Sequence, residues 1–113
     1  MNFEKVKDAI LKFRDDRDRK QFHNPKDLAE AISIESWELL EKFLRKSQEE
    51  SRNIAKNNPD VKDEVADIFN YLILFADNCN IDLESSILDK IKHNNKKYSI
   101  EKAKGRSDKY TKL

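Results

Sequence analysis

The sequence predicts an all-α protein built as a four-helix bundle. Charged residues make up 40% of its 113 residues, whereas the chain has one Gly and two Pro, a composition typical of helices joined by short loops. Apolar residues recur at helical spacing, so disorder does not explain the high charge. A chain of this length predicts one domain, residues 1–113, whose modest core gains from oligomerisation.

Two helices are expected in the first half of the chain. In the first, from about residue 3 to about residue 20, Val6, Ile10 and Phe13 recur at helical spacing. Asn24-Pro25 is typical of an N-cap followed by proline in the first turn, and it predicts a second helix to about residue 50. The apolar stripe of this second helix is Leu28, Ile32, Leu39, Leu40 and Phe43.

Two further helices are expected before a basic tail. Asn58-Pro59 repeats the start signal and predicts a third helix to about Cys79. Asp82 is the expected N-cap of a fourth, and short connections favour antiparallel neighbours in the bundle. The apolar stripe of the fourth helix is Leu83, Ile87, Leu88 and Ile91. Beyond Tyr98 the periodicity fades, and about residues 99–113 are expected to form an extended tail with a turn at Gly105.

Charge and composition exclude several classes of protein. A net charge of +1 argues against binding nucleic acid through bulk charge. No apolar run reaches the length of a membrane span, and the N-terminus has no signal-peptide pattern, so we expect a cytoplasmic protein without a membrane partner. The lone Cys79 excludes an intrachain disulfide. Lys and Arg concentrate near the C-terminus, as either a solvated tail or a local anion site.

Two carboxylates mark the third helix. At 100° per residue, Asp67 lies about 60° from Glu64, with Tyr71 between them. Ile68 and Phe75 lie within about 40° of Glu64 on its other side. The acids are therefore predicted to lie on the arc that faces the core, where unpaired carboxylates are costly.

A second acidic pair, Glu35 and Glu38, has the same spacing beside the apolar stripe of the second helix. Four facing carboxylates would repel one another, and helix bundles place metal ions between such groups. All-oxygen ligands favour Mg²⁺, with Mn²⁺ as a substitute. The alternative is that Lys or Arg from other helices neutralises the acids.

Magnesium held by carboxylates commonly meets substrate phosphates, which indicates a polyphosphate substrate. The C-terminal segment can supply cationic, amide and hydroxyl groups to it. These groups belong to Asn94, Lys96, Lys97, Tyr98, Arg106, Lys109 and Tyr110.

The ordered pairs Glu35-x-x-Glu38 and Glu64-x-x-Asp67 resemble the signature of the MazG-like, all-α nucleoside triphosphate pyrophosphohydrolases, and most of all their dCTP pyrophosphatase branch. The resemblance covers nearly the whole chain. Its other motifs are FRDDRD, QFHNPKDLA, EVADIFNYL and the terminal GRSDKYTKL.

This resemblance implies a Mg²⁺-dependent enzyme that cleaves a nucleoside triphosphate between its α and β phosphates. The products are a nucleoside monophosphate and pyrophosphate. The implied metal ligands are Glu35, Glu38, Glu64 and Asp67, with Glu38 as the candidate that orients the attacking water. It also implies a homotetramer, a dimer of dimers, with sites between subunits. The implied nucleotide-pocket residues are His23, Tyr71 and Asn94, and the phosphate-side residues are Lys97, Tyr98, Lys109 and Tyr110.

Three positions depart from the family pattern. Arg19 and Arg45 stand where close relatives often carry Trp residues that hold the base, while Trp37 stands at a position that is usually small. Arginine can stack on a base through its planar guanidinium. We therefore expect the metal chemistry to carry over and the base preference to differ.

Two alternatives stand beside a dCTP-like activity. One is a pyrophosphatase for another nucleotide, such as dUTP or a triphosphate with a damaged base. The other is a non-enzymatic helical oligomer that binds a nucleotide or a partner protein.

Overall fold

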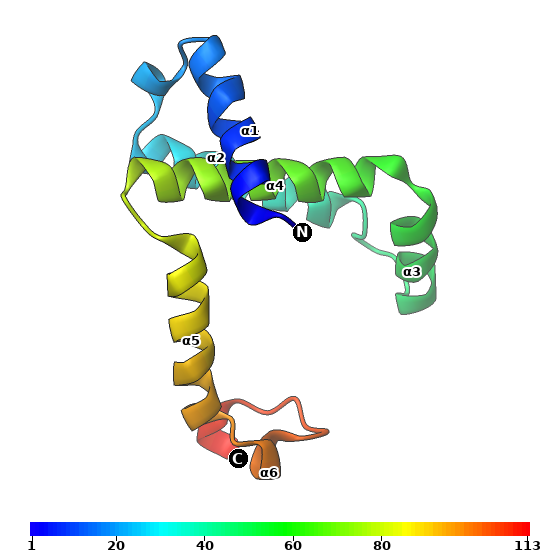
Figure 1. Ribbon diagram of the computed structural model, residues 1–113. Helices are drawn as coiled ribbons and strands as arrows, with labels where there is room; N and C mark the ends of the chain where they lie inside the picture. The colour runs from blue at the N-terminus through cyan, green and yellow to red at the C-terminus, as the bar shows by residue number, and fades with distance from the viewer. The chain divides into compact units, whose positions relative to one another are not determined.

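The computed structural model describes residues 1–113 and confirms the all-α prediction, because its regular elements are all helices. The chain divides into two compact units, Met1–Asn80 and Ile81–Leu113. There are six α-helices where four were predicted, and Figure 1 shows their order along the chain. The assignment of residues 1–113 to one domain stays a prediction.

The first unit is organised around two long helices. The pair α2 (Pro25–Glu41) and α4 (Pro59–Asn78) makes the most extensive helix contact in the chain, and α1 (Phe3–Asp16) and α3 (Gln48–Asn57) both pack on α4. The start signals act as predicted. The Asn24 side chain accepts from the Asp27 N–H, and the Asn58 side chain accepts from the Asp60 N–H, each before a proline.

The prediction that the second helix continues to about residue 50 is wrong. Helix α2 ends at Glu41, and Arg45 takes a left-handed conformation with φ 62°, which a helix cannot accommodate. Ser47 then starts α3 with a capping box, in which its side chain accepts from the Glu50 N–H and Glu50 accepts from the Ser47 N–H. The Ser-x-x-Glu pattern of this start signal was present in the sequence.

The first helix is also shorter than predicted. It ends at Asp16, because Asp18 is left-handed with φ 50° and the carbonyl of Arg14 accepts the N–H of both Arg17 and Arg19. A short 3₁₀ helix, Lys20–Phe22, follows. The loop that carries it reaches α4, where Asn78 contacts the carbonyl of His23.

Polar contacts join the end of α1 and the end of this loop to α4. Arg14 is buried at 5% exposure, and its Nη1 donates to Asp77 Oδ2 at 2.7 Å while its Nε donates to Asp15 at 2.8 Å. Asn78 Nδ2 donates to the carbonyl of His23 at 3.3 Å. The fully apolar part of the core is small, and Leu28, Ile73 and Ala76 are its buried residues.

The second unit consists of α5 (Leu83–Lys97), the one-turn α6 (Ile100–Ala103) and a 3₁₀ helix, Tyr110–Lys112. The tail predicted to be extended is therefore partly helical, because the carbonyls of Ser99 and Ile100 accept backbone hydrogen bonds from the N–H groups of residues 102–104. Gly105, with φ 78°, makes the predicted turn. None of the helices in the chain is both long enough and apolar enough to cross a lipid bilayer.

Candidate functional site

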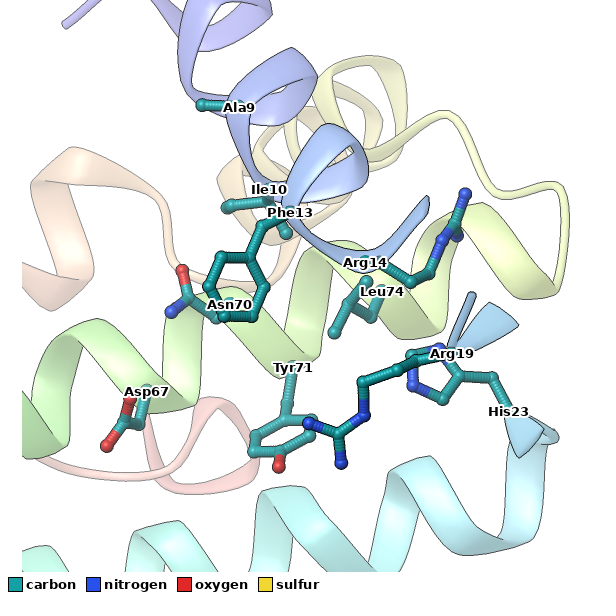
Figure 2. Close-up of a pocket in the computed structure, with 10 residues that line it drawn as sticks. All are labelled: Ala9, Ile10, Phe13, Arg14, Arg19, His23, Asp67, Asn70, Tyr71 and Leu74. Atoms are coloured by element: carbon teal, nitrogen blue, oxygen red, sulfur yellow. The ribbon is translucent and has the colours of Figure 1, made fainter. Parts of the chain in front are cut away.

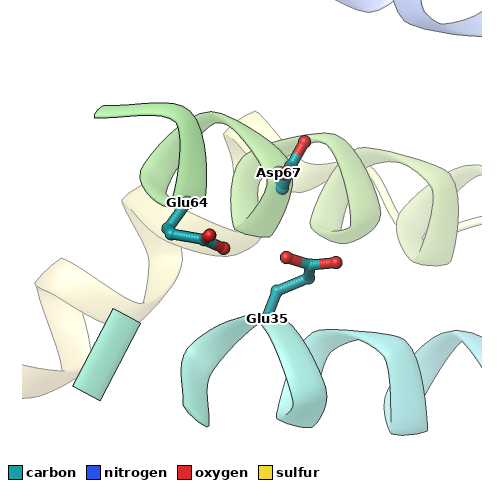
Figure 3. A group of neighbouring side chains, drawn as sticks. All are labelled: Glu35, Glu64 and Asp67. Carbon is teal, nitrogen blue, oxygen red and sulfur yellow. The ribbon is translucent and has the colours of Figure 1, made fainter. Parts of the chain in front are cut away.

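Three of the four predicted acids come together between α2 and α4. Carboxylate oxygens of Glu35, Glu64 and Asp67 all lie within 4.8 Å of one another, and Figure 3 shows Glu35 directed from α2 toward Glu64, with Asp67 beside them on α4. Glu64 and Asp67 project from adjacent turns of α4, whereas Glu35 comes from α2. The i, i+3 spacing and the antiparallel contact of these helices produce the cluster. We call these three residues the acidic cluster.

Glu38, the fourth predicted acid, borders the acidic cluster one turn further along α2. Burial raises the pKa of both Glu35 and Glu64, and the neighbouring carboxylate of Glu38 raises each of them further. For Glu35 these effects raise the pKa to about 7.

The acidic cluster lacks the partners that would neutralise it within the chain. Glu35 Oε2 and Glu64 Oε2 are buried without a hydrogen-bond partner. The cation that approaches is Lys42, with its Nζ 4.0 Å from Glu64 Oε1, so the alternative of neutralisation by Lys or Arg has one distant contact in its favour. Buried carboxylate oxygens without a partner, in a site whose ligands are all oxygen atoms, fit a hard divalent cation.

A pocket of about 420 Å³ lies beside the acidic cluster, between α1, the 3₁₀ loop and α4 (Figure 2). It contains four predicted site residues, and Asp67 belongs to both the pocket and the acidic cluster. Its complete lining is Ala9, Ile10, Phe13, Arg14, Arg19, His23, Asp67, Asn70, Tyr71 and Leu74. This is the size range of small-molecule sites, with apolar walls and a few polar groups.

His23 presents a buried, unused nitrogen in this region. Its Nδ1 has no hydrogen-bond partner. Burial lowers the pKa of His23, and the positive charges of Arg14 and Arg19 lower it further. The imidazole is therefore neutral near pH 7 and offers one donor and one acceptor.

Several predicted site residues lie outside the pocket. Arg45 is in the turn after α2, and Trp37 projects from α2 with 52% of its surface exposed. The remaining predicted substrate-binding residues all belong to the second unit. Within it, Tyr98 and Tyr110 form an edge-to-face pair with ring centroids 6.0 Å apart, and Lys97 Nζ lies 4.6 Å from the Tyr110 centroid. Asn94 is one turn before Tyr98 on α5, and Lys109 precedes Tyr110.

Sequence reasoning missed Arg14, Phe13 and Asn70 as pocket residues. Arg14 follows Ile10 by four positions, so the helical period alone places it on the same arc as the apolar stripe of α1. Asn70 follows Asp67 by three positions, on the same side of α4. Neither of these spacings distinguishes a pocket residue from a solvated one, because that depends on how α1 packs on α4.

With this fold and site, the chain belongs to the MazG-like family, whose model matches residues 31–113. Its curated relatives include dCTP pyrophosphatase 1 of Mus musculus, 32% identical over 97% of this chain, and that of Bos taurus, 33% identical over 97%. The chain spans 66% and 67%, respectively, of the length of these two relatives.

A solved structure supports the same assignment. The crystal structure of a pyrophosphatase from Archaeoglobus fulgidus DSM 4304 is 34% identical to this chain. It superposes with a TM-score of 0.80, covering 88% of this chain and 94% of the other. The expected family resemblance is thereby confirmed at the level of both sequence and fold.

Proposed function

We propose that this protein hydrolyses a nucleoside or deoxynucleoside triphosphate to the monophosphate and pyrophosphate, with Mg²⁺ bound by the acidic cluster and Glu38. The observation that carries the proposal is the shared position of Asp67, which belongs both to the acidic cluster and to the wall of the pocket. A nucleotide held in this pocket can direct its phosphates to the metal ligands. The relatives named dCTP pyrophosphatase and pyrophosphatase favour this chemistry.

Glu38 has a second task in this proposal besides binding the cation. Glu35, Glu64 and Asp67 would hold the cation together with Glu38, and the bound cation would offset charge on the phosphates and lower the pKa of a coordinated water. Glu38 orients the attacking water and accepts its proton. The water oxygen forms a bond to the α-phosphorus, the bond from that phosphorus to the bridging oxygen breaks, and pyrophosphate leaves.

Burial prepares the acidic cluster for a cation. In the metal-free protein the raised pKa of Glu35, about 7, reflects the cost of holding its negative charge beside other carboxylates. A divalent ion relieves that cost, so binding is coupled to release of protons from the acidic cluster. The apolar walls of the pocket hold the nucleoside and exclude water from its ring faces.

We also propose a homotetramer, a dimer of dimers, as the working assembly. On and just after α2, Trp37, Leu40 and Leu44 are 52%, 48% and 44% exposed. On α5, Ile87, Leu88 and Ile91 are each at least half exposed. Such apolar surface is typical of interfaces. Light scattering tests the assembly, and a monomer mass at micromolar concentration would reject it.

The function is tested by incubating the purified protein with canonical and modified nucleoside triphosphates, with and without Mg²⁺. We expect equal amounts of monophosphate and pyrophosphate, formed only when Mg²⁺ or Mn²⁺ is present. Release of inorganic phosphate and a nucleoside diphosphate would assign cleavage to the other phosphoanhydride bond. Binding without cleavage of any substrate would favour the alternative of a non-enzymatic nucleotide-binding oligomer.

A further inference from the structure

Arg19 is the pocket residue whose charge is unused within the chain. None of the ion pairs in the structure involves it, and its side chain takes no part in capping the 3₁₀ helix that follows it. Figure 2 shows its guanidinium directed across the pocket toward Tyr71. By contrast, Arg14 in the same pocket is held by Asp15 and Asp77. Arg19 is therefore available to a ligand.

The free polar groups of the pocket contain an excess of hydrogen-bond donors. Arginine has five N–H donors and no acceptor, so it contributes donors alone. His23, Asn70 and Tyr71 each offer both a donor and an acceptor and can adapt to either kind of partner. Asp67 offers acceptors only, but its oxygens belong to the acidic cluster. A ligand that satisfies this pocket must present acceptors to Arg19.

Nucleobases differ in this respect at one ring position. Guanine carries the acceptor O6 on its six-membered ring, and thymine and uracil carry O4 at the equivalent place. Adenine and cytosine carry amino donors there instead. An amino group placed against the guanidinium would bring two donors together without an acceptor between them, which selects against it.

We propose that Arg19 is a specificity-determining residue that selects 6-oxopurine and 4-oxopyrimidine nucleoside triphosphates over those with an amino group at that position. The base lies against the apolar walls of Ile10, Phe13 and Leu74, with its carbonyl edge toward Arg19. This inference rests on the proposed nucleotide function and specifies its substrate class. It predicts a base preference opposite to that named for the dCTP pyrophosphatase relatives.

The test measures binding separately from turnover. Triphosphates of guanine, uracil, adenine and cytosine with an imido bridge between the α and β phosphorus cannot be cleaved there, and each is titrated calorimetrically into the protein with Mg²⁺. We expect the oxo bases to bind about tenfold or more tightly than the amino bases, the scale of one hydrogen bond to a charged group. Equal affinities, or tighter binding of cytosine or adenine, would overturn the proposal.

Variants then assign the preference to Arg19. Arg19→Gln, whose amide offers both a donor and an acceptor, is expected to bind the two classes with similar affinity. Arg19→Lys keeps the charge without the planar fork and should retain only part of the preference. Arg52→Gln, which removes an exposed arginine from α3, is the matched control and should keep the wild-type preference.

A uniform loss would give a different answer. If Arg19→Gln and Arg19→Lys weaken all four analogues by the same factor, Arg19 acts on the phosphates, and the proposal is wrong. The proposed function is judged separately, from pyrophosphate release with cleavable substrates. Selective binding of oxo bases without any cleavage would reject the enzyme and leave the role of Arg19 standing.

Discussion

The two halves of α4 differ in whether their acidic side chains are paired with a cation. In the first half, Glu64 and Asp67 face Glu35, and buried carboxylate oxygens have no partner. In the second half, Asp77 is paired at 2.7 Å with the buried Arg14. A paired charge holds one helix against another. Unpaired charges at the same interface lower the stability of the fold unless a ligand neutralises them. The difference separates the structural end of α4 from its binding end.

The largest expected effect is at the binding end. Asp67→Asn should abolish pyrophosphate release, because the metal site loses one charge while the amide occupies nearly the same volume. Helix content measured by circular dichroism should stay unchanged. In metal-free buffer the variant is expected to unfold at an equal or higher temperature, since repulsion within the acidic cluster falls. Wild-type turnover in this variant would remove Asp67 from the site.

The next effect is at the structural end. Arg14→Met should lower the free energy of unfolding by roughly 2–3 kcal/mol, because Asp77 and Asp15 lose charge-assisted hydrogen bonds and the methionine keeps most of the volume. Urea unfolding at fixed protein concentration measures it. The control is Lys12→Met, which removes the 2.6 Å ion pair with Asp16, whose partners are 75% and 53% exposed. That control should cost about 0–1 kcal/mol.

A smaller effect is expected at Arg19 and Arg45, which form no ion pair, than at Arg14. The double change Arg19→Trp and Arg45→Trp should leave the free energy of unfolding near that of wild type. It should lower KM for a cytosine nucleotide, since a stacked base gains about 1–3 kcal/mol, with little change in kcat. Steady-state kinetics at saturating Mg²⁺ measures it. An equal loss of kcat on every substrate would place these arginines at the phosphates rather than at the base.

The smallest expected effect is the pH dependence of the metal-free protein. The pKa of Glu35 is about 7 in the folded state, against 4.5 as its ordinary value, so the folded protein binds more protons between these pH values. This contribution to stability is fully present below pH 4.5 and is lost as the pH rises through 7. The effect is modest, because the acidic cluster includes the exposed Asp67 and solvent screens it.

Thermal unfolding with a chelator at pH 5 and pH 8 measures this dependence. We expect a lower unfolding temperature at pH 8, and added Mg²⁺ should restore it by occupying the acidic cluster. Glu35→Gln should reduce the difference between the two pH values. Glu30→Gln, an exposed change on α2, is the control and should keep the wild-type difference. Equal unfolding temperatures of the wild type at the two pH values would mean that the raised pKa of Glu35 does not affect stability as predicted.

Sequence alone determined the helical class and most helix starts. Local rules suffice for these features, because the N-caps Asn24 and Asn58 accept from N–H groups only three and two residues away, respectively. The same period of 3.6 residues predicted that Glu35, Glu64 and Asp67 lie on core-facing arcs, and the structure partly buries Glu35 and Glu64 but leaves Asp67 exposed. The helix ends were harder, since Asp18 and Arg45 take left-handed conformations that their residue types do not demand.

Only the tertiary structure decided which of the many charged residues belong to the site and which hold the fold. Arg14 and Arg19 are five positions apart and chemically identical, yet one is buried against Asp77 and the other is unpaired at the wall of the pocket. No local pattern separates these two arginines, because the difference depends on where α1 and the loop after it meet α4. Arg14 and its partner Asp77 are 63 residues apart in the sequence. Long-range packing sets burial, and burial determines whether a charge stabilises the fold or binds a ligand.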